Sequence, residues 1–141
     1  MAYNASVIVD TSFFVAFICS QDSNHSKSMD FLEHLLKNYD VYISNYIYLE
    51  FATIASQRIG KEGLRNILSQ FPLFGITEIF ISEDLHDKIK KEFVKLVDKN
   101  ISFVDLSTSY IAKIHNIENV LTFDEHFKKL GKQYGFKVLG C

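Results

Sequence analysis

Four carboxylates stand at positions where the surrounding sequence favours burial or the end of a strand. Asp10 closes the apolar run at 6–10, which is rich in β-branched residues, and Asp124 comes directly after a second apolar run at 119–123. Continuous apolar runs of this kind are typical of strands that are buried on both faces of a parallel sheet. Both acids are therefore expected at the carboxyl end of a buried strand.

Glu50 and Asp105 complete the set, each on a predicted helix. At about 100° per residue Glu50 lies about 60° from Ile47, on the border of an apolar stripe, and should be partly buried. A Glu side chain is rarely buried unless it is paired or binds a metal. Asp105 follows the short segment 102–104 and opens a helix that is rich in hydroxyl side chains.

Each acid also has an ordinary structural interpretation. Asp10, Asp105 and Asp124 could be N-caps of the helices that follow them, since Asp is a preferred N-cap, and Glu50 could pair with a Lys or Arg. Together, however, they predict several carboxylates at one edge of one sheet. Two like charges about 4 Å apart repel by roughly 4 kcal/mol at an effective dielectric constant of about 20. Such a cluster needs protons or divalent cations, and oxygen ligands favour Mg²⁺ or Mn²⁺ over Zn²⁺.

The elements that would position these acids alternate between strands and helices. The pattern predicts strands at 6–10, 41–44, 76–82, 119–123 and 136–139, and helices at 12–19, 25–38, 45–59, 61–69, 83–98, 105–116 and 125–131. This alternation predicts an α/β fold with a five-stranded, mostly parallel sheet flanked by helices. Active sites in such folds lie beyond the carboxyl ends of the strands, where the acids are expected.

Composition sets the remaining bounds. With 141 residues, of which 48% are hydrophobic, the chain is expected to form a single domain over 1–141 with a real core. The formal net charge of −2 excludes a protein that holds nucleic acid by bulk positive charge, although not an enzyme that acts on it. The apolar stretch at 13–19 is too short to span a membrane, and no signal peptide is visible, so a cytoplasmic location is expected.

Four short motifs carry a resemblance to a known family. They look like the four acidic motifs of PIN-domain ribonucleases, and their order and spacing are similar to those of VapC-type toxins of toxin–antitoxin pairs. The motifs are Val7-Ile8-Val9-Asp10-Thr11-Ser12, Tyr48-Leu49-Glu50-Phe51, Phe103-Val104-Asp105 and Leu121-Thr122-Phe123-Asp124-Glu125-His126-Phe127. The resemblance extends from Val7 to Leu139 and implies a three-layer, PIN-like fold.

The resemblance also implies a site and a reaction. Asp10, Glu50, Asp105 and Asp124 would be the catalytic residues and the ligands of Mg²⁺ or Mn²⁺ in an endoribonuclease that hydrolyses RNA phosphodiester bonds. The products would carry a 3′-hydroxyl and a 5′-phosphate. Hydroxyls near these acids would support the site, and the candidates are Thr11, Ser12, Ser107 and Thr122. The implied partners are the RNA substrate, an antitoxin protein that covers the active-site groove, and a second copy of the chain in a homodimer.

Other interpretations stay open at this point. The chain could be a housekeeping RNA-processing PIN nuclease, or a non-catalytic PIN-like module that binds RNA or protein. An aspartyl phosphatase is disfavoured because it needs a second Asp two residues after the first, where this chain has Ser12. Tyr46 and Tyr48 flank Glu50 and could stack on bases, although packing is the ordinary role for them. His126 is the only His near the proposed site, where a surface role is expected.

Overall fold

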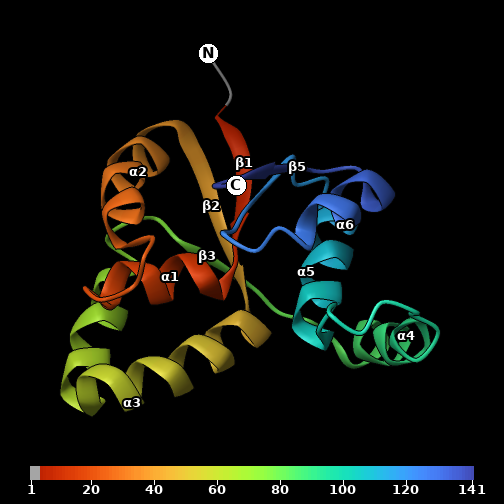
Figure 1. Ribbon diagram of the computed structural model, residues 1–141, viewed down its shortest axis with the longest axis horizontal. Helices are drawn as coiled ribbons and strands as arrows, with labels where there is room; N and C mark the ends of the chain where they lie inside the picture. Colours follow the sequence, from red (N-terminus) through yellow and green to blue (C-terminus); the bar gives the residue numbers. More distant parts are fainter. Residues whose placement is uncertain (1–3) are drawn as a thin grey trace.

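A five-stranded sheet forms the centre of the protein in a computed structural model that describes residues 4–141 (Figure 1). The strand order is β3-β2-β1-β4-β5, and every neighbouring pair is parallel. The strands are β1 (Ala5–Val9), β2 (Tyr39–Ser44), β3 (Thr77–Ile79), β4 (Asn119–Leu121) and β5 (Lys137–Leu139). Because all five run in the same direction, their carboxyl ends meet at one edge, as expected from the alternating pattern.

Helices cover both faces of this sheet. In Figure 1, α1, α2 and α3 lie on one side of the strands, whereas α4, α5 and α6 lie on the other. Their bounds are α1 (Thr11–Ile18), α2 (His25–Asn38), α3 (Asn45–Gln70), α4 (Glu83–Phe93), α5 (Phe103–Ile114) and α6 (Phe127–Tyr134). The predicted α/β class and three-layer arrangement are confirmed.

The two helices expected at 45–59 and 61–69 are present within α3, where Gly60 separates them by a kink with a non-helical φ of 75°. One other helix is shorter than predicted. The helix expected to reach residue 98 ends at Phe93. After this point the amides of Lys95 and Leu96 donate to the carbonyls three residues earlier, instead of the four that an α-helix requires. Val97, which lies within the predicted range of that helix but beyond its actual end, is 94% exposed.

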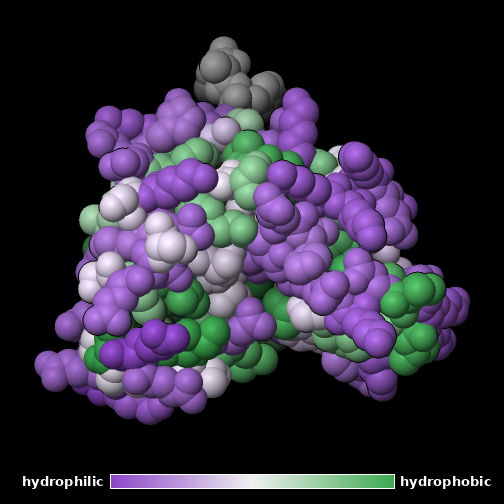
Figure 2. Space-filling view, viewed as in Figure 1, coloured by the Kyte–Doolittle hydropathy of each residue, from purple (hydrophilic) through white to green (hydrophobic). Residues whose placement is uncertain are grey.

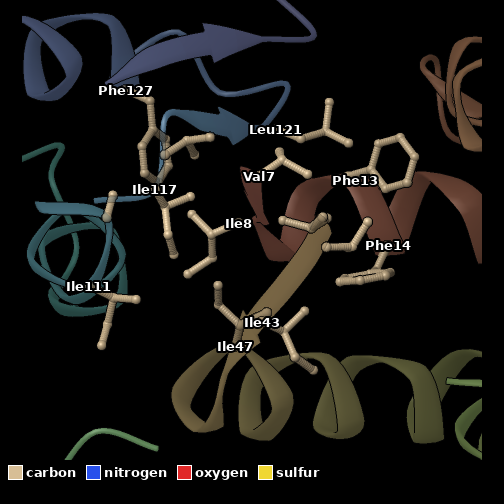
Figure 3. Packing of buried hydrophobic residues seen from close by; sticks show 14 of the residues in the cluster. Val7, Ile8, Phe13, Phe14, Ile43, Ile47, Ile111, Ile117, Leu121 and Phe127 are labelled. Atoms are coloured by element: carbon tan, nitrogen blue, oxygen red, sulfur yellow. The ribbon is translucent and has the colours of Figure 1, made fainter. Parts of the chain in front are cut away.

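The core is built around β1. Val7, Ile8 and Val9 are fully buried, as expected for a central strand with helices on both faces. Figure 3 shows Phe13 of α1 on one side of this strand and Ile111 of α5 on the other. This packing fixes the carboxyl end of β1 firmly in the middle of the sheet edge.

The outer surface is mostly polar. Figure 2 shows a largely hydrophilic face, with apolar atoms gathered near the end of α4; the exposed apolar side chains of that stretch are Val94 and Val97. None of the helices formed by residues 4–141 combines the length and apolar character needed to cross a bilayer.

Candidate active site

The four predicted acids line one pocket of about 340 Å³. Asp10 directly follows β1, and Asp124 lies three residues beyond the end of the neighbouring strand β4. Glu50 comes from the second turn of α3, which starts at the end of β2, and Asp105 comes from the first turn of α5. Residues that are up to 114 positions apart thus meet at the carboxyl edge of the sheet.

Asp10 is the most buried of these acids, with 5% of its surface exposed. Its Oδ2 accepts hydrogen bonds from the Ser12 hydroxyl at 2.9 Å, the Thr122 hydroxyl at 2.8 Å and the Ser12 amide at 3.4 Å. Asp10 is therefore the N-cap of α1 as well as a member of the pocket, so the two interpretations of this residue hold together. Within residues 4–141 the other oxygen, Oδ1, has no donor, which leaves it available to a cation.

Two hydroxyls join the ends of β1 and β4. The hydroxyls of Ser12 and Thr122 lie 3.2 Å apart. Ser12 also accepts the amide hydrogen of Phe123 at 3.0 Å, and Thr122 accepts that of Asp124 at 3.0 Å. The network holds the Asp10 carboxylate and the backbone that carries Asp124 in one rigid unit.

Asp105 takes a different place on its helix from the expected one. Ser102 is the N-cap of α5, and Asp105 is the third residue inside the helix, where the two form a capping box with 3.0 Å bonds in both directions. Burial, followed by the negative charges of Asp10 and Asp124, raises the pKa of Asp105 to about 6, against the lowering effect of the hydrogen bonds with Ser102.

Glu50 and Asp124 are less buried. Glu50 is partly buried as predicted, and among the ion pairs of the described residues it has no Lys or Arg partner, which removes the salt-bridge interpretation. Asp124 Oδ1 accepts the His126 amide at 2.9 Å and lies 2.6 Å from His126 Nδ1. His126 thus contacts an acid of the pocket, although 47% of its side chain is exposed.

The electrostatics of the pocket favour a bound cation. Five acidic side chains and no Lys or Arg line it among residues 4–141: Asp10, Asp22, Glu50, Asp105 and Asp124. Burial, and then the charge of Glu50, raise the pKa of Asp10 above its usual range. Thr11 also lines this pocket, and its hydroxyl oxygen is buried and has no hydrogen-bond partner in the described part of the chain.

One predicted residue does not line the pocket, and one lining residue was not predicted. Ser107 is not brought to the pocket: it is buried and donates to the Phe103 carbonyl at 2.7 Å, inside its own helix. Asp22, in the loop between α1 and α2, lines the pocket but was not among the predicted residues. The position of Asp22 in the sequence could have indicated its place. It lies in the loop after α1, the helix that starts at the carboxyl end of β1, so this loop can approach the same edge of the sheet.

A side-chain arrangement that would hold a metal ion without rearrangement is not present. Over residues 4–141, no three His, Cys, Asp or Glu side chains converge closely enough to form a complete site. The acids surround an open pocket instead of meeting at a point. Mg²⁺ commonly keeps several of its waters and is bound directly by only one or two carboxylates, so an open ring of acids suits it.

Comparison with known families and structures gives a consistent assignment. The PIN domain family matches the chain over residues 7–133. Comparison with curated protein sequences found no significant match.

Solved structures share the fold. VapC20 from Mycobacterium tuberculosis, described as a toxin that cleaves the sarcin–ricin loop, is 23% identical over 89% of this chain and 95% of its own, with a TM-score of 0.78. VapBC2 from Rickettsia felis, bound to a DNA fragment from its promoter, is 21% identical over 95% and 97%, with a TM-score of 0.66. FitAcB from Neisseria gonorrhoeae is 20% identical over 95% and 96%, with a TM-score of 0.63.

Proposed function

The chain belongs to the PIN domain family, and from this premise we propose that it is a metal-dependent endoribonuclease that hydrolyses RNA phosphodiester bonds. One observation carries the proposal: Asp10, Glu50, Asp105 and Asp124 come from four separate parts of the chain and line one pocket that no basic side chain of residues 4–141 lines. A structural role for these acids would leave them as isolated caps or ion pairs instead of neighbours.

The residues present fit Mg²⁺ or Mn²⁺. The donors are carboxylate and hydroxyl oxygens, which suit hard cations, and the Thr11 hydroxyl is a buried oxygen without a partner in the described chain. Asp10, Glu50, Asp105 and Asp124 would hold the cation. When bound, such a cation supplies a lowered pKa for water and charge neutralisation at the phosphoryl group.

The other side chains orient the acids and receive the substrate. Ser12 and Thr122 fix the Asp10 carboxylate through its Oδ2, which leaves Oδ1 without a donor among the described residues, and His126 restrains Asp124. Lys27 lies 5.9 Å from the ring centre of Phe123, which also lines the pocket, so its charge is available to an RNA phosphate beside the acids.

The biological role that we propose is that of a toxin in a VapBC-type toxin–antitoxin system. The fold shared with VapC20, VapBC2 and FitAcB supports this role. The proposed partners are an antitoxin that covers the pocket and a second copy of the chain, and we propose that residues 1–141 act as a single domain in the cytoplasm. Arrest of growth on expression, and relief by an antitoxin encoded beside the gene, would support the role.

The reaction is tested by incubating a mixed RNA pool with the purified protein in Mg²⁺, in Mn²⁺ and in EDTA. We expect cleavage with either metal and none in EDTA, with a 5′-phosphate on the downstream product. Cleavage that persists in EDTA would contradict the proposed chemistry, and its absence with both metals across several RNA classes would contradict the proposed activity.

A further inference from the structure

An apolar groove of about 460 Å³ adjoins the carboxylate pocket between α3, α4 and α5. We name it the aromatic groove, because three of its lining side chains are the rings of Tyr46, His86 and Phe103. Glu50 and Ile54 line both the groove and the pocket, so the two are continuous. A chain with one phosphate at the acids would therefore extend into this groove.

The three rings form a cluster, and each comes from a different helix: Tyr46 from α3, His86 from α4 and Phe103 from the start of α5. The Tyr46 and Phe103 rings lie 6.3 Å apart, and the His86 and Phe103 rings lie 5.5 Å apart. The Tyr46 hydroxyl is hydrogen-bonded to His86 Nδ1. Phe93 packs against Phe103 at 5.3 Å. These contacts hold the rings in place before any ligand arrives.

The chemistry of the groove suits a nucleobase better than a phosphate. Glu50 is its only acidic side chain among the described residues, and no Lys or Arg lines it. A base is neutral and presents an apolar face, and bases of any sequence stack on aromatic side chains. When Tyr46 donates to Nδ1, His86 Nε2 carries the hydrogen and can donate to the edge of a base.

We propose that the aromatic groove binds the base of a nucleotide that neighbours the scissile phosphate in single-stranded RNA. Tyr46 and Phe103 stack on this base, and His86 contacts its edge and so influences which base is accepted. This inference rests on the proposed function, since it names the part of the RNA that lies beside the carboxylate pocket.

Binding of short single-stranded RNA tests this subsite without relying on cleavage. Fluorescence anisotropy is measured in Mg²⁺ on the Asp10→Asn background, which keeps the RNA intact. We expect Tyr46→Leu and Phe103→Leu each to weaken binding roughly five- to a hundredfold, and Tyr46→Phe to retain it. Tyr134→Leu is the matched control, because Tyr134 pairs with Tyr110 at 5.5 Å and lines neither the groove nor the pocket.

An abasic ribose-phosphate oligomer separates stacking from a general structural effect. The Leu variants should bind this oligomer as tightly as the parent protein does, because it has no base to lose. Two variants on different helices keep the test valid if one of them fails to fold. Equal affinity of both Leu variants and Tyr134→Leu for intact RNA would overturn the inference, and would assign the groove to a protein partner or to no ligand.

Cleavage by the wild type distinguishes this inference from the proposed function. If the wild type cleaves RNA while the Leu variants bind it normally, the subsite is wrong and the nuclease stands. If the wild type does not cleave but the Leu variants lose base-dependent binding, the nuclease is wrong, and the groove is a base-binding site of a protein that binds RNA without cleaving it.

Discussion

The Thr122 hydroxyl donates to the Asp10 carboxylate across 2.8 Å, although the two residues are 112 positions apart in the chain. The same oxygen of Thr122 accepts the amide hydrogen of Asp124 at 3.0 Å. Thr122 itself is fully buried, directly after β4 and beside the end of β1. One hydroxyl thus links two acids of the pocket, so its removal should affect both.

Thr122→Val keeps the shape of the side chain but removes both of these hydrogen bonds. We expect cleavage to fall roughly 10- to 100-fold, as is typical when a residue that orients a metal ligand is lost. Thr108→Val is the matched control, because the buried Thr108 hydroxyl donates only to the Val104 carbonyl of its own helix. Rates are measured on one defined RNA; similar losses in both variants would mean that Thr122 acts through stability alone.

Close packing between Gly131 of α6 and the backbone of Phe136 can be tested by substitution. A Cβ at this position would lie 2.7 Å from the Phe136 carbonyl oxygen, so we expect Gly131→Ala to lower the free energy of unfolding by about 1–3 kcal/mol. Gly63→Ala should change it less, because the added Cβ would crowd the Ile59 side chain at 3.0–3.1 Å while the helix preference of Ala offsets part of that cost. Urea unfolding checks both, and an equal loss in the two variants would contradict the packing at Gly131.

Stability without metal should depend on pH through Asp105. Its pKa is raised from 3.8 to about 6, so the folded protein binds this proton more tightly than the unfolded chain does. The folded state therefore loses stability as the pH rises from about 4 to about 6, and the loss is complete above that range. We expect Asp105 to contribute a loss on the order of 1–3 kcal/mol that Asp105→Asn removes, whereas the contribution of Asp10, whose pKa is also raised, remains in that variant.

Urea unfolding in EDTA at several pH values measures this dependence for the wild type and for Asp105→Asn. The capping box with Ser102 contributes a difference that does not vary with pH, because Asn can also accept the Ser102 amide. Parallel stability curves for the two proteins would contradict the raised pKa.

Divalent cations should stabilise the folded protein at neutral pH. A ligand that binds only the folded state at about 100 times its dissociation constant adds about 2.7 kcal/mol. We expect Mn²⁺ to raise the melting temperature of the wild type and of Glu118→Gln, since Glu118 is an exposed acid before β4, away from the pocket. Asp10→Asn should lose most of this rise, and an equal rise in all three proteins would place the cation elsewhere.

The fold was largely predictable from local pattern. The buried runs at 6–10 and 119–123 indicated parallel central strands, and the helix at 25–38 has the predicted bounds. The strand predicted at 76–82 is shorter, because β3 is an edge strand that pairs with β2 over only three residues. Pairing length at an edge depends on the neighbouring strand, which a local pattern does not contain.

The site was predictable in type but not in detail. Parallel strands put Asp10 and Asp124 at one edge, so their proximity followed from the pattern. The capping box at Ser102 was readable in principle, but Asp105 was expected to open its helix, whereas Ser102 is the N-cap and Asp105 is the third residue inside the helix. Ser107 sits close to Asp105 in the sequence, yet its helix directs it to the Phe103 carbonyl. Contacts of this kind depend on side-chain direction, which spacing alone does not determine.

The most direct test of the account compares RNA cleavage by the wild type, Asp10→Asn and Glu118→Gln in Mn²⁺, under matched concentrations and purification. We expect the wild type and Glu118→Gln to cleave the same bonds at similar rates, and Asp10→Asn, although folded, to lose cleavage at least about 100-fold. Equal cleavage by Asp10→Asn and the wild type would contradict the account, because the activity would then come from another site or from a contaminating nuclease.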